Sequence, residues 1–240
     1  MDLVQELNQT TLGLLRDLGA EPFAQRLLAG AITADEYASF LVQTYLYVRY
    51  TRPLLRRAAE RLSERANSPE LAALFQQKAD EEDGHEQWAL ADLAAIGRDP
   101  DEARCASPTP AVSAYIAWNS FTVECGSPVA FLGTAYVLEA LSAARAAETV
   151  KNLVAESGIP GIERAVVFLR GHADADTGHV EQLGRWLLIL AGSPADRRDV
   201  LLSAMITRVT YAKLLAGITP ASSPPPERAG ITARARAIER

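Results

Sequence analysis

Apolar residues recur along most of the 240-residue chain at the three-to-four-residue spacing of helices that bury one face. Glycine, proline and capping residues divide this pattern into segments, none of which shows a convincing strand alternation. The expected helices cover residues 3–18, 33–65, 68–96, 107–124, 127–156, 160–190 and 193–215, with a short turn over 22–29. The pattern therefore predicts a single all-α domain at residues 1–218, a bundle of seven to eight helices.

Several of these boundaries carry recognisable capping chemistry. Thr33 is followed three residues later by Glu36, the arrangement of a capping box, and Pro53 is expected to kink the helix that begins there. Ser-Pro pairs at 68–69, 127–128 and 193–194 favour helix starts, because proline suits the first helical position. Residues 219–240 contain "SSPPP" and an Arg-rich end, which predicts a Pro-rich linker and a mobile tail.

Composition and charge exclude several classes of protein. The formal net charge of −6 argues against a nucleic-acid partner, which needs an excess of Lys and Arg. The apolar stretch at residues 186–191 is far shorter than the roughly 20 residues of a membrane span. The opening "MDLVQELNQTT" does not resemble a signal peptide, and the two cysteines do not form a secreted disulfide framework. We therefore expect a cytoplasmic protein with two reduced thiols.

The segment "GHADADTGH" holds two of the three histidines in the chain. In a helix, Asp176 and His179 lie about 40° and about −20° from His172, so the three side chains share one stripe. Asp174 points to the opposite side of the helix. An exposed His-Asp pair is the alternative explanation, but three ligand-type residues at offsets of four and seven favour a metal site.

The third histidine lies in the acidic segment "ADEEDGHEQWALADL". Glu82 and His85 have the Glu-x-x-His spacing that projects two ligands inward in carboxylate-bridged dimetal bundles. Glu81, four residues before His85, is the rival carboxylate. An acidic, solvated helix face remains the alternative here.

Glu139 is the only charged residue in the apolar segment "GSPVAFLGTAYVLEALSAA". A buried carboxylate must be paired, protonated or bound to a cation. No Lys or Arg lies within a helical turn of Glu139, so metal binding is favoured, with a salt bridge from another helix as the alternative.

Together these segments supply three imidazoles and three carboxylates. Mixed nitrogen and oxygen ligands suit iron or manganese and are poor for a structural zinc site. Two divalent ions would bring a charge of +4 against −3 from the carboxylates, so the buried charge would nearly cancel. The predicted ligands are Glu82, His85, Glu139, His172, Asp176 and His179.

The chain resembles the heme-oxygenase-like diiron oxidases and oxygenases, the iron-containing redox enzymes, over roughly residues 20–190. The resemblance rests on "RLLAGAITADEYASFLVQTYLYVRYT", "EEDGHEQWALADLAAIG", "GTAYVLEAL" and "FLRGHADADTGHVEQL", of which the His-x-x-x-Asp-x-x-His motif is the most specific. It implies a heme-oxygenase-like bundle that binds two loosely held irons at the same six residues. In some relatives the first carboxylate lies seven residues before the first histidine. Lys78 occupies that position here, so Glu82 or Glu81 must serve.

The resemblance also implies O2 activation at a diferrous centre through a peroxo-diferric intermediate. The expected substrate is a small amine, amino acid or fatty acid, which undergoes N-oxygenation or oxidative C–C or C–N cleavage. No heme is expected, because the chain has no histidine before His85 to serve as a proximal ligand. An external electron donor and a second copy of the chain are candidate partners.

Two other functions remain open. One is metal-free chemistry on the same fold, as in the pyrroloquinoline-quinone synthases and the thiaminase-like enzymes, which need no complete ligand set. The other is an iron-binding protein without turnover, since ferritin-like carriers also place Glu-x-x-His pairs on helices. Oxygen consumption coupled to loss of an organic substrate would separate an oxidase from such a carrier.

Overall fold

The structure is a computed structural model that describes residues 2–64, 69–190 and 193–218, without the side chains of residues 174–177 and 189–190. Every regular element in these ranges is helical, so the prediction of an all-α fold is confirmed. The α-helices are α1 (Leu3–Gly19), α2 (Pro22–Leu28), α3 (Ala34–Val48), α4 (Thr51–Ser63), α5 (Pro69–Glu81), α6 (His85–Ala95), α7 (Pro100–Cys105), α8 (Pro110–Glu124), α9 (Phe131–Glu156), α10 (Val167–Leu190) and α11 (Pro194–Ala216). Two 3-10 turns, η1 (Pro128–Ala130) and η2 (Ile162–Arg164), precede α9 and α10.

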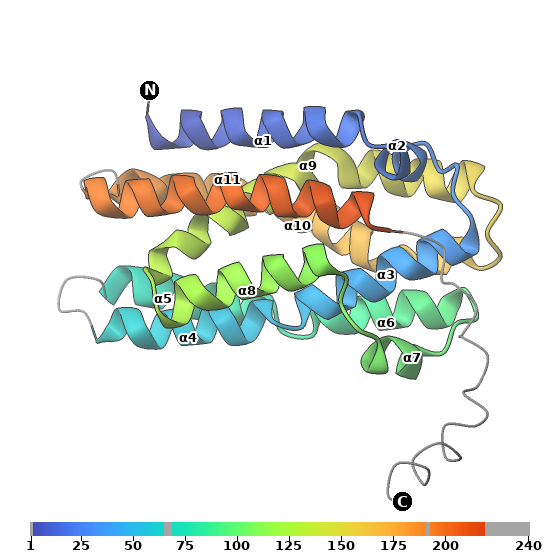
Figure 1. Cartoon of the computed structure of the whole chain (residues 1–240), viewed down its shortest axis with the longest axis horizontal. Coiled ribbons are helices and arrows are strands. Elements are labelled where there is room, and N and C mark those ends of the chain that lie inside the picture. The colour runs from blue at the N-terminus through green and yellow to red at the C-terminus, as the bar shows by residue number, and fades with distance from the viewer. Residues whose placement is uncertain (1, 65–68, 191–192, 219–240) are drawn as a thin grey trace, which may run out of the picture.

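Most of the helices run along the long axis of the molecule (Figure 1). Helices α1, α9 and α11 pack together, and α9 also packs along α10. Helices α4 and α5 form a second closely packed pair, and α3 packs against α6. The arrangement brings α5, α6, α9 and α10, which are distant in sequence, around the same interior region.

Several helix starts follow the capping chemistry that the sequence predicts. The Thr33 hydroxyl accepts the N–H of Glu36, and the Glu36 carboxylate accepts the N–H of Thr33, which completes the capping box of α3. Helix α11 begins at Pro194, where the Ser193 hydroxyl accepts the N–H of Asp196. These bonds satisfy backbone donors that the first helical turn leaves unpaired.

The number and length of the helices differ from the prediction. The segment at 33–65 is two helices, because α3 ends at Val48 and Pro53 lies in the first turn of α4 rather than at a kink. The segment at 68–96 is also divided, between α5 and α6. The expected turn at 22–29 is the helix α2, α7 was not predicted, and α10 begins at Val167 rather than at Pro160. The described residues thus form eleven α-helices, more than the seven to eight expected.

The division between α5 and α6 lies at Gly84, which has a φ of 83°. Residues that have a Cβ rarely adopt this left-handed backbone conformation, so glycine permits the turn there. The backbone N–H of Gln87 then donates to the Gly84 carbonyl as α6 begins. This interruption falls between two of the predicted metal ligands, Glu82 and His85.

Helix α9 forms part of the core. Among the described residues, the segment Pro128–Glu156 is the one long and apolar enough, by length and composition, to cross a membrane. However, 56% of its most apolar window is buried inside the bundle, where it packs against α1, α10 and α11. Its apolar character is explained by these contacts with neighbouring helices.

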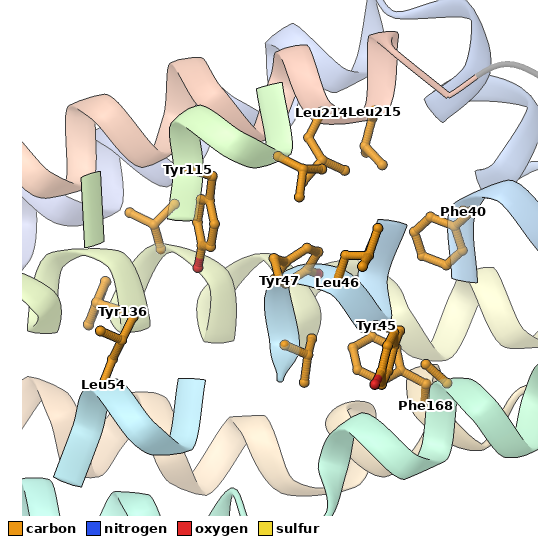
Figure 2. Packing of buried hydrophobic residues seen from close by; sticks show 14 of the residues in the cluster. Phe40, Tyr45, Leu46, Tyr47, Leu54, Tyr115, Tyr136, Phe168, Leu214 and Leu215 are labelled. Atoms are coloured by element: carbon orange, nitrogen blue, oxygen red, sulfur yellow. The ribbon is translucent and has the colours of Figure 1, made fainter. Parts of the chain in front are cut away.

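The core around the interior region is rich in aromatic and leucine side chains. Figure 2 shows Tyr47 of α3, Tyr115 of α8 and Phe168 of α10 among the residues of this cluster, together with Leu214 and Leu215 near the end of α11. The Tyr47 ring contacts Tyr115 edge-on at a centroid distance of 5.3 Å, and it contacts Tyr211 of α11 in the same way at 6.2 Å. The predicted linker and tail at residues 219–240 lie outside the described residues.

Candidate metal centre

Glu82 and His85 are close together, but they do not lie on one continuous helix as the sequence predicts. Glu82 follows the last residue of α5, and His85 is the first residue of α6, on the other side of Gly84. The Glu82 carboxylate (Oε2) nevertheless lies 3.0 Å from His85 Nδ1. Burial alone raises the pKa of Glu82, but its hydrogen bond with His85 and nearby positive charge bring the pKa below its usual value. Glu82 is therefore an ionised carboxylate beside an imidazole.

His172 of α10 is held in a form that suits a metal ligand. Its Nδ1 lies 2.8 Å from the backbone carbonyl of Phe168. A carbonyl oxygen only accepts, so Nδ1 carries the proton and Nε2 keeps its lone pair. Burial lowers the pKa of His172, which keeps the ring neutral. A neutral imidazole oriented by a backbone carbonyl is the usual arrangement of a metal-binding histidine.

Glu82, His85 and His172 form a group of potential ligands in the part of the chain that the structure describes. One ligand atom from each residue lies within 4.8 Å of the other two. Two atoms that bind the same metal ion at about 2.1 Å each can be no more than about 4.2 Å apart. The ligand atoms would therefore have to move toward one another by less than about 1 Å to bind one ion. One carboxylate oxygen and two imidazole nitrogens are ligands that iron accepts. These three residues therefore fit one iron ion.

Trp88, which the sequence analysis did not identify, orients the two imidazoles. Its ring stacks on His85 at a centroid distance of 3.9 Å and an angle of 26°, and it meets His172 edge-on at 5.7 Å. Gly171, next to His172, makes room for this ring, because a Cβ there would lie 2.6 Å from the Trp88 side chain. The signal in the sequence was the placement of Trp88 three residues after His85.

Asp92 links α6 to the helix that carries His172. Its fully buried carboxylate accepts the backbone N–H groups of Val167 and Phe168, the first two residues of α10, at 2.8 and 2.9 Å. Burial raises the pKa of Asp92 to about 6, although both hydrogen bonds favour the charged form. Asp92 was also missed from sequence. Its signal was a single carboxylate in the apolar stretch "ALADLAAIG", the same kind of signal that identified Glu139.

The remaining described ligand candidates surround Lys78 of α5. The Lys78 ammonium (Nζ) lies 2.9 Å from Glu81 Oε2 and 3.5 Å from Glu139 Oε1, and the Lys78 side chain is 5% exposed. His179 Nε2 lies 3.6 Å from Glu81 Oε2. The salt bridge from another helix, left open as an alternative for Glu139, is present. The side chains of Asp174 and Asp176 lie outside the described residues, although their backbone belongs to α10.

Members of both groups line a cavity of ≈ 230 Å³. Its charged and metal-binding side chains are Lys78, Glu82, Glu139, Arg145 and His172, and most other lining residues are apolar. Tyr47, Tyr115 and Tyr211 also line it, and burial raises the pKa of each phenol, so all three stay protonated. The cavity therefore combines a polar ligand cluster with a mainly hydrocarbon-like wall.

Comparison with protein families gives one match. The sequence profile of a family described as iron-containing redox enzymes matches residues 38–209. This range contains all six predicted ligands, as well as Lys78, Trp88 and Asp92. No curated protein matches the chain.

Solved structures share the fold. A domain of unknown function with a heme oxygenase-like fold from Shewanella denitrificans has a TM-score of 0.81 at 23% identity and covers 91% of this chain and 92% of its own. A TenA homologue from Pseudomonas syringae has a TM-score of 0.70 at 10% identity, covering 88% and 90%. A TenA homologue from Pyrococcus furiosus has a TM-score of 0.68 at 13% identity, covering 89% and 98%. At these identities the likeness concerns the fold, which is heme oxygenase-like.

Proposed function

Because the chain belongs to the family of iron-containing redox enzymes, we propose that it is an O2-activating non-heme iron oxidase or oxygenase. The observation that supports this most strongly is the group formed by Glu82, His85 and His172, whose ligand atoms lie within 4.8 Å of one another beside a cavity. These residues would hold the first iron. Glu139, Asp176 and His179, the other three residues of the predicted six-ligand set, would be left for a second iron, and Lys78 lies 3.5 Å from Glu139.

The chain's own residues prepare this site for oxidation. Iron, when bound, supplies one-electron redox chemistry with O2. His172 is held neutral and oriented by its hydrogen bond to Phe168, so no proton must leave Nε2 before it binds a metal. The apolar wall of the cavity limits access of water to the site. The protonated phenols of Tyr47, Tyr115 and Tyr211 are hydrogen-bond donors for a polar group of a substrate.

The cavity wall favours one kind of substrate among those expected. A cavity lined mainly by apolar side chains can bury an apolar chain, and its few charged side chains, such as Arg145, can pair with the charged end of that substrate. We therefore propose a fatty acid or an amine that carries an apolar chain. N-oxygenation and oxidative C–C or C–N cleavage are distinguished by the mass of the product.

The function is tested with protein loaded anaerobically with Fe(II) and then exposed to O2 and candidate fatty acids, amines and amino acids. Oxygen uptake and substrate loss, followed by mass spectrometry, should occur together and only with iron. His172→Ala should abolish both. Gln87→Ala, which changes an exposed residue of α6, is the matched control and should keep wild-type activity.

Two outcomes would favour the alternatives. Substrate conversion that persists in chelator would indicate metal-free chemistry on this fold. Iron binding without turnover of any of the three substrate classes would indicate an iron-binding protein. The external electron donor, the homodimer, the cytoplasmic location and the lack of nucleic-acid or membrane partners remain predictions.

A further inference from the structure

Lys78 introduces a positive charge next to Glu139, one of the remaining predicted metal ligands. Its ammonium lies within 3.5 Å of two carboxylates, Glu81 and Glu139, that come from different helices. Lysine is rarely buried unless it is paired, and this side chain is only 5% exposed. The ammonium is therefore held in place by these carboxylates, which it neutralises in part.

Metal ions and ammonium groups compete for the same carboxylate oxygens. An ion shared by Glu81 and Glu139 would need a position about 2 Å from an oxygen of each, which lies within the volume of the Lys78 head group. A divalent ion placed next to an ammonium in a buried site is also strongly repelled. The two cations therefore exclude each other at this position.

The charges of the described groups are compatible with one bound ion. Glu81, Glu82 and Glu139 bring −3 and Lys78 brings +1, which leaves −2 among these four side chains. One divalent ion balances the charge of these four; the carboxylate of Asp176 is not counted, because its side chain lies outside the described residues. The ligands at Glu82, His85 and His172 provide a place for one ion, whereas Lys78 forms ion pairs with Glu81 and Glu139.

We propose that the Lys78 side chain takes the place of a second iron, so that the wild-type chain holds one iron at Glu82, His85 and His172. This inference rests on the proposed function for the identity of the metal. Lys78 then acts as a specificity-determining residue for metal stoichiometry. It holds Glu139 in an ion pair without binding the metal itself.

The test is anaerobic titration with Fe(II), followed by removal of free metal and measurement of iron per chain. Wild type should retain one iron. Lys78→Glu replaces the cation by a carboxylate at the position where some relatives have a ligand, and it should retain two. Lys151→Met removes a lysine charge at an exposed position of α9 and should retain one, like wild type. Circular dichroism of each apo protein establishes that the variants are folded.

A second measurement does not depend on iron. In chelator, Lys78→Met and Glu139→Gln should each lower Tm, and the double variant should lower it by clearly less than the sum, because each single change leaves a partner with unbalanced charge. Additive effects would overturn the assigned role of Lys78.

The outcomes separate this proposal from the proposed function. Two irons of similar affinity in wild type, or a folded Lys78→Glu protein that still retains one, would overturn the inference about Lys78 alone. An iron content near zero in every protein would instead reject the proposed function together with the one-iron stoichiometry. The thermal measurements in chelator would still decide whether Lys78 and Glu139 are coupled.

Discussion

At the residue scale, the charge state of single buried side chains decides what this site can bind. His172 is neutral and offers Nε2, whereas Glu82 is ionised because its pKa is lowered by His85 and nearby positive charge despite burial. Glu81 and Glu139 both form an ion pair with Lys78. Neutral imidazole and ionised carboxylate are the forms that coordinate a metal, so the site does not need to lose protons at neutral pH before it binds one.

Glu139→Gln tests the salt bridge in the absence of metal. From sequence alone, the substitution should be neutral or slightly stabilising in apo protein, because it removes a buried charge from a crowded cluster. The contact with Lys78 reverses this expectation. We expect a loss of about 1–3 kcal/mol in the free energy of unfolding, less than for a fully broken buried pair because Glu81 remains. Thermal melting in chelator measures it, and a Tm at or above wild type would contradict it.

At the element scale, contacts between helices position the ligands. Asp92 ties α6 to the start of α10, and Trp88 packs between His85 and the segment that contains Gly171. His85 begins α6, whereas His172 lies in the second turn of α10. The distance between these two ligands therefore depends on how α6 and α10 are held together.

Gly171→Ala should disturb this contact. The added Cβ would lie 2.6 Å from the Trp88 ring, so the ring must shift and its stacking on His85 must change. We expect a destabilisation of about 1–3 kcal/mol, typical of overpacking, and weaker iron binding. Gly184→Ala on the same helix is the control, because its Cβ would meet nothing within 4 Å. It should be neutral or stabilising by about 1 kcal/mol, and equal melting of the two variants would refute the packing argument.

Asp92→Asn should change how stability depends on pH. The pKa of Asp92 is raised from 3.8 to about 6 in the folded state. The stabilisation that follows from this raised pKa is fully present below pH 3.8 and is lost as pH rises through 6. Over this window the free energy of unfolding of the wild type should fall by about 3 kcal/mol relative to that of the variant, whose amide does not titrate. Chemical denaturation of both proteins between pH 4 and 7.5 measures the difference. A constant difference across that range would show that the pKa of Asp92 is not raised.

At the scale of the whole molecule, the ligands come from three helical segments that are separated in sequence. The turn between α5 and α6 provides Glu82, α6 provides His85 and α10 provides His172. A metal ion bound by all three would link these elements in the folded state only. Binding of iron should therefore increase the stability of the complete bundle.

Anaerobic Fe(II) should raise the Tm of the wild type. At a free iron concentration about 100 times the Kd, the stabilisation is about 2.7 kcal/mol. For a chain of this length that corresponds to roughly 5–10 °C. His172→Ala should show little of this shift, whereas Gln87→Ala should show all of it. An equal shift in the wild type and in His172→Ala would place the iron elsewhere.

Several features that depend on neighbouring residues were predicted correctly from the sequence, whereas contacts between distant segments were not. The capping box at Thr33 and the helix start at Pro194 depend on residues within one turn, and both were predicted. The interruption at Gly84 was not predicted, because glycine is also tolerated within helices. The contact of Lys78 with Glu139 joins residues 61 positions apart and depends on the packing of α5 near α9. No local pattern contains that information.

The buried ammonium of Lys78 also has a genetic consequence. The codons for lysine and glutamate differ by one base in their first position, so a single transition converts one residue into the other. If this side chain sets the number of metal ions, chains that hold one iron and chains that hold two are separated by one point mutation. The residue seven positions before the first histidine ligand would then predict the number of metal ions that a related chain binds.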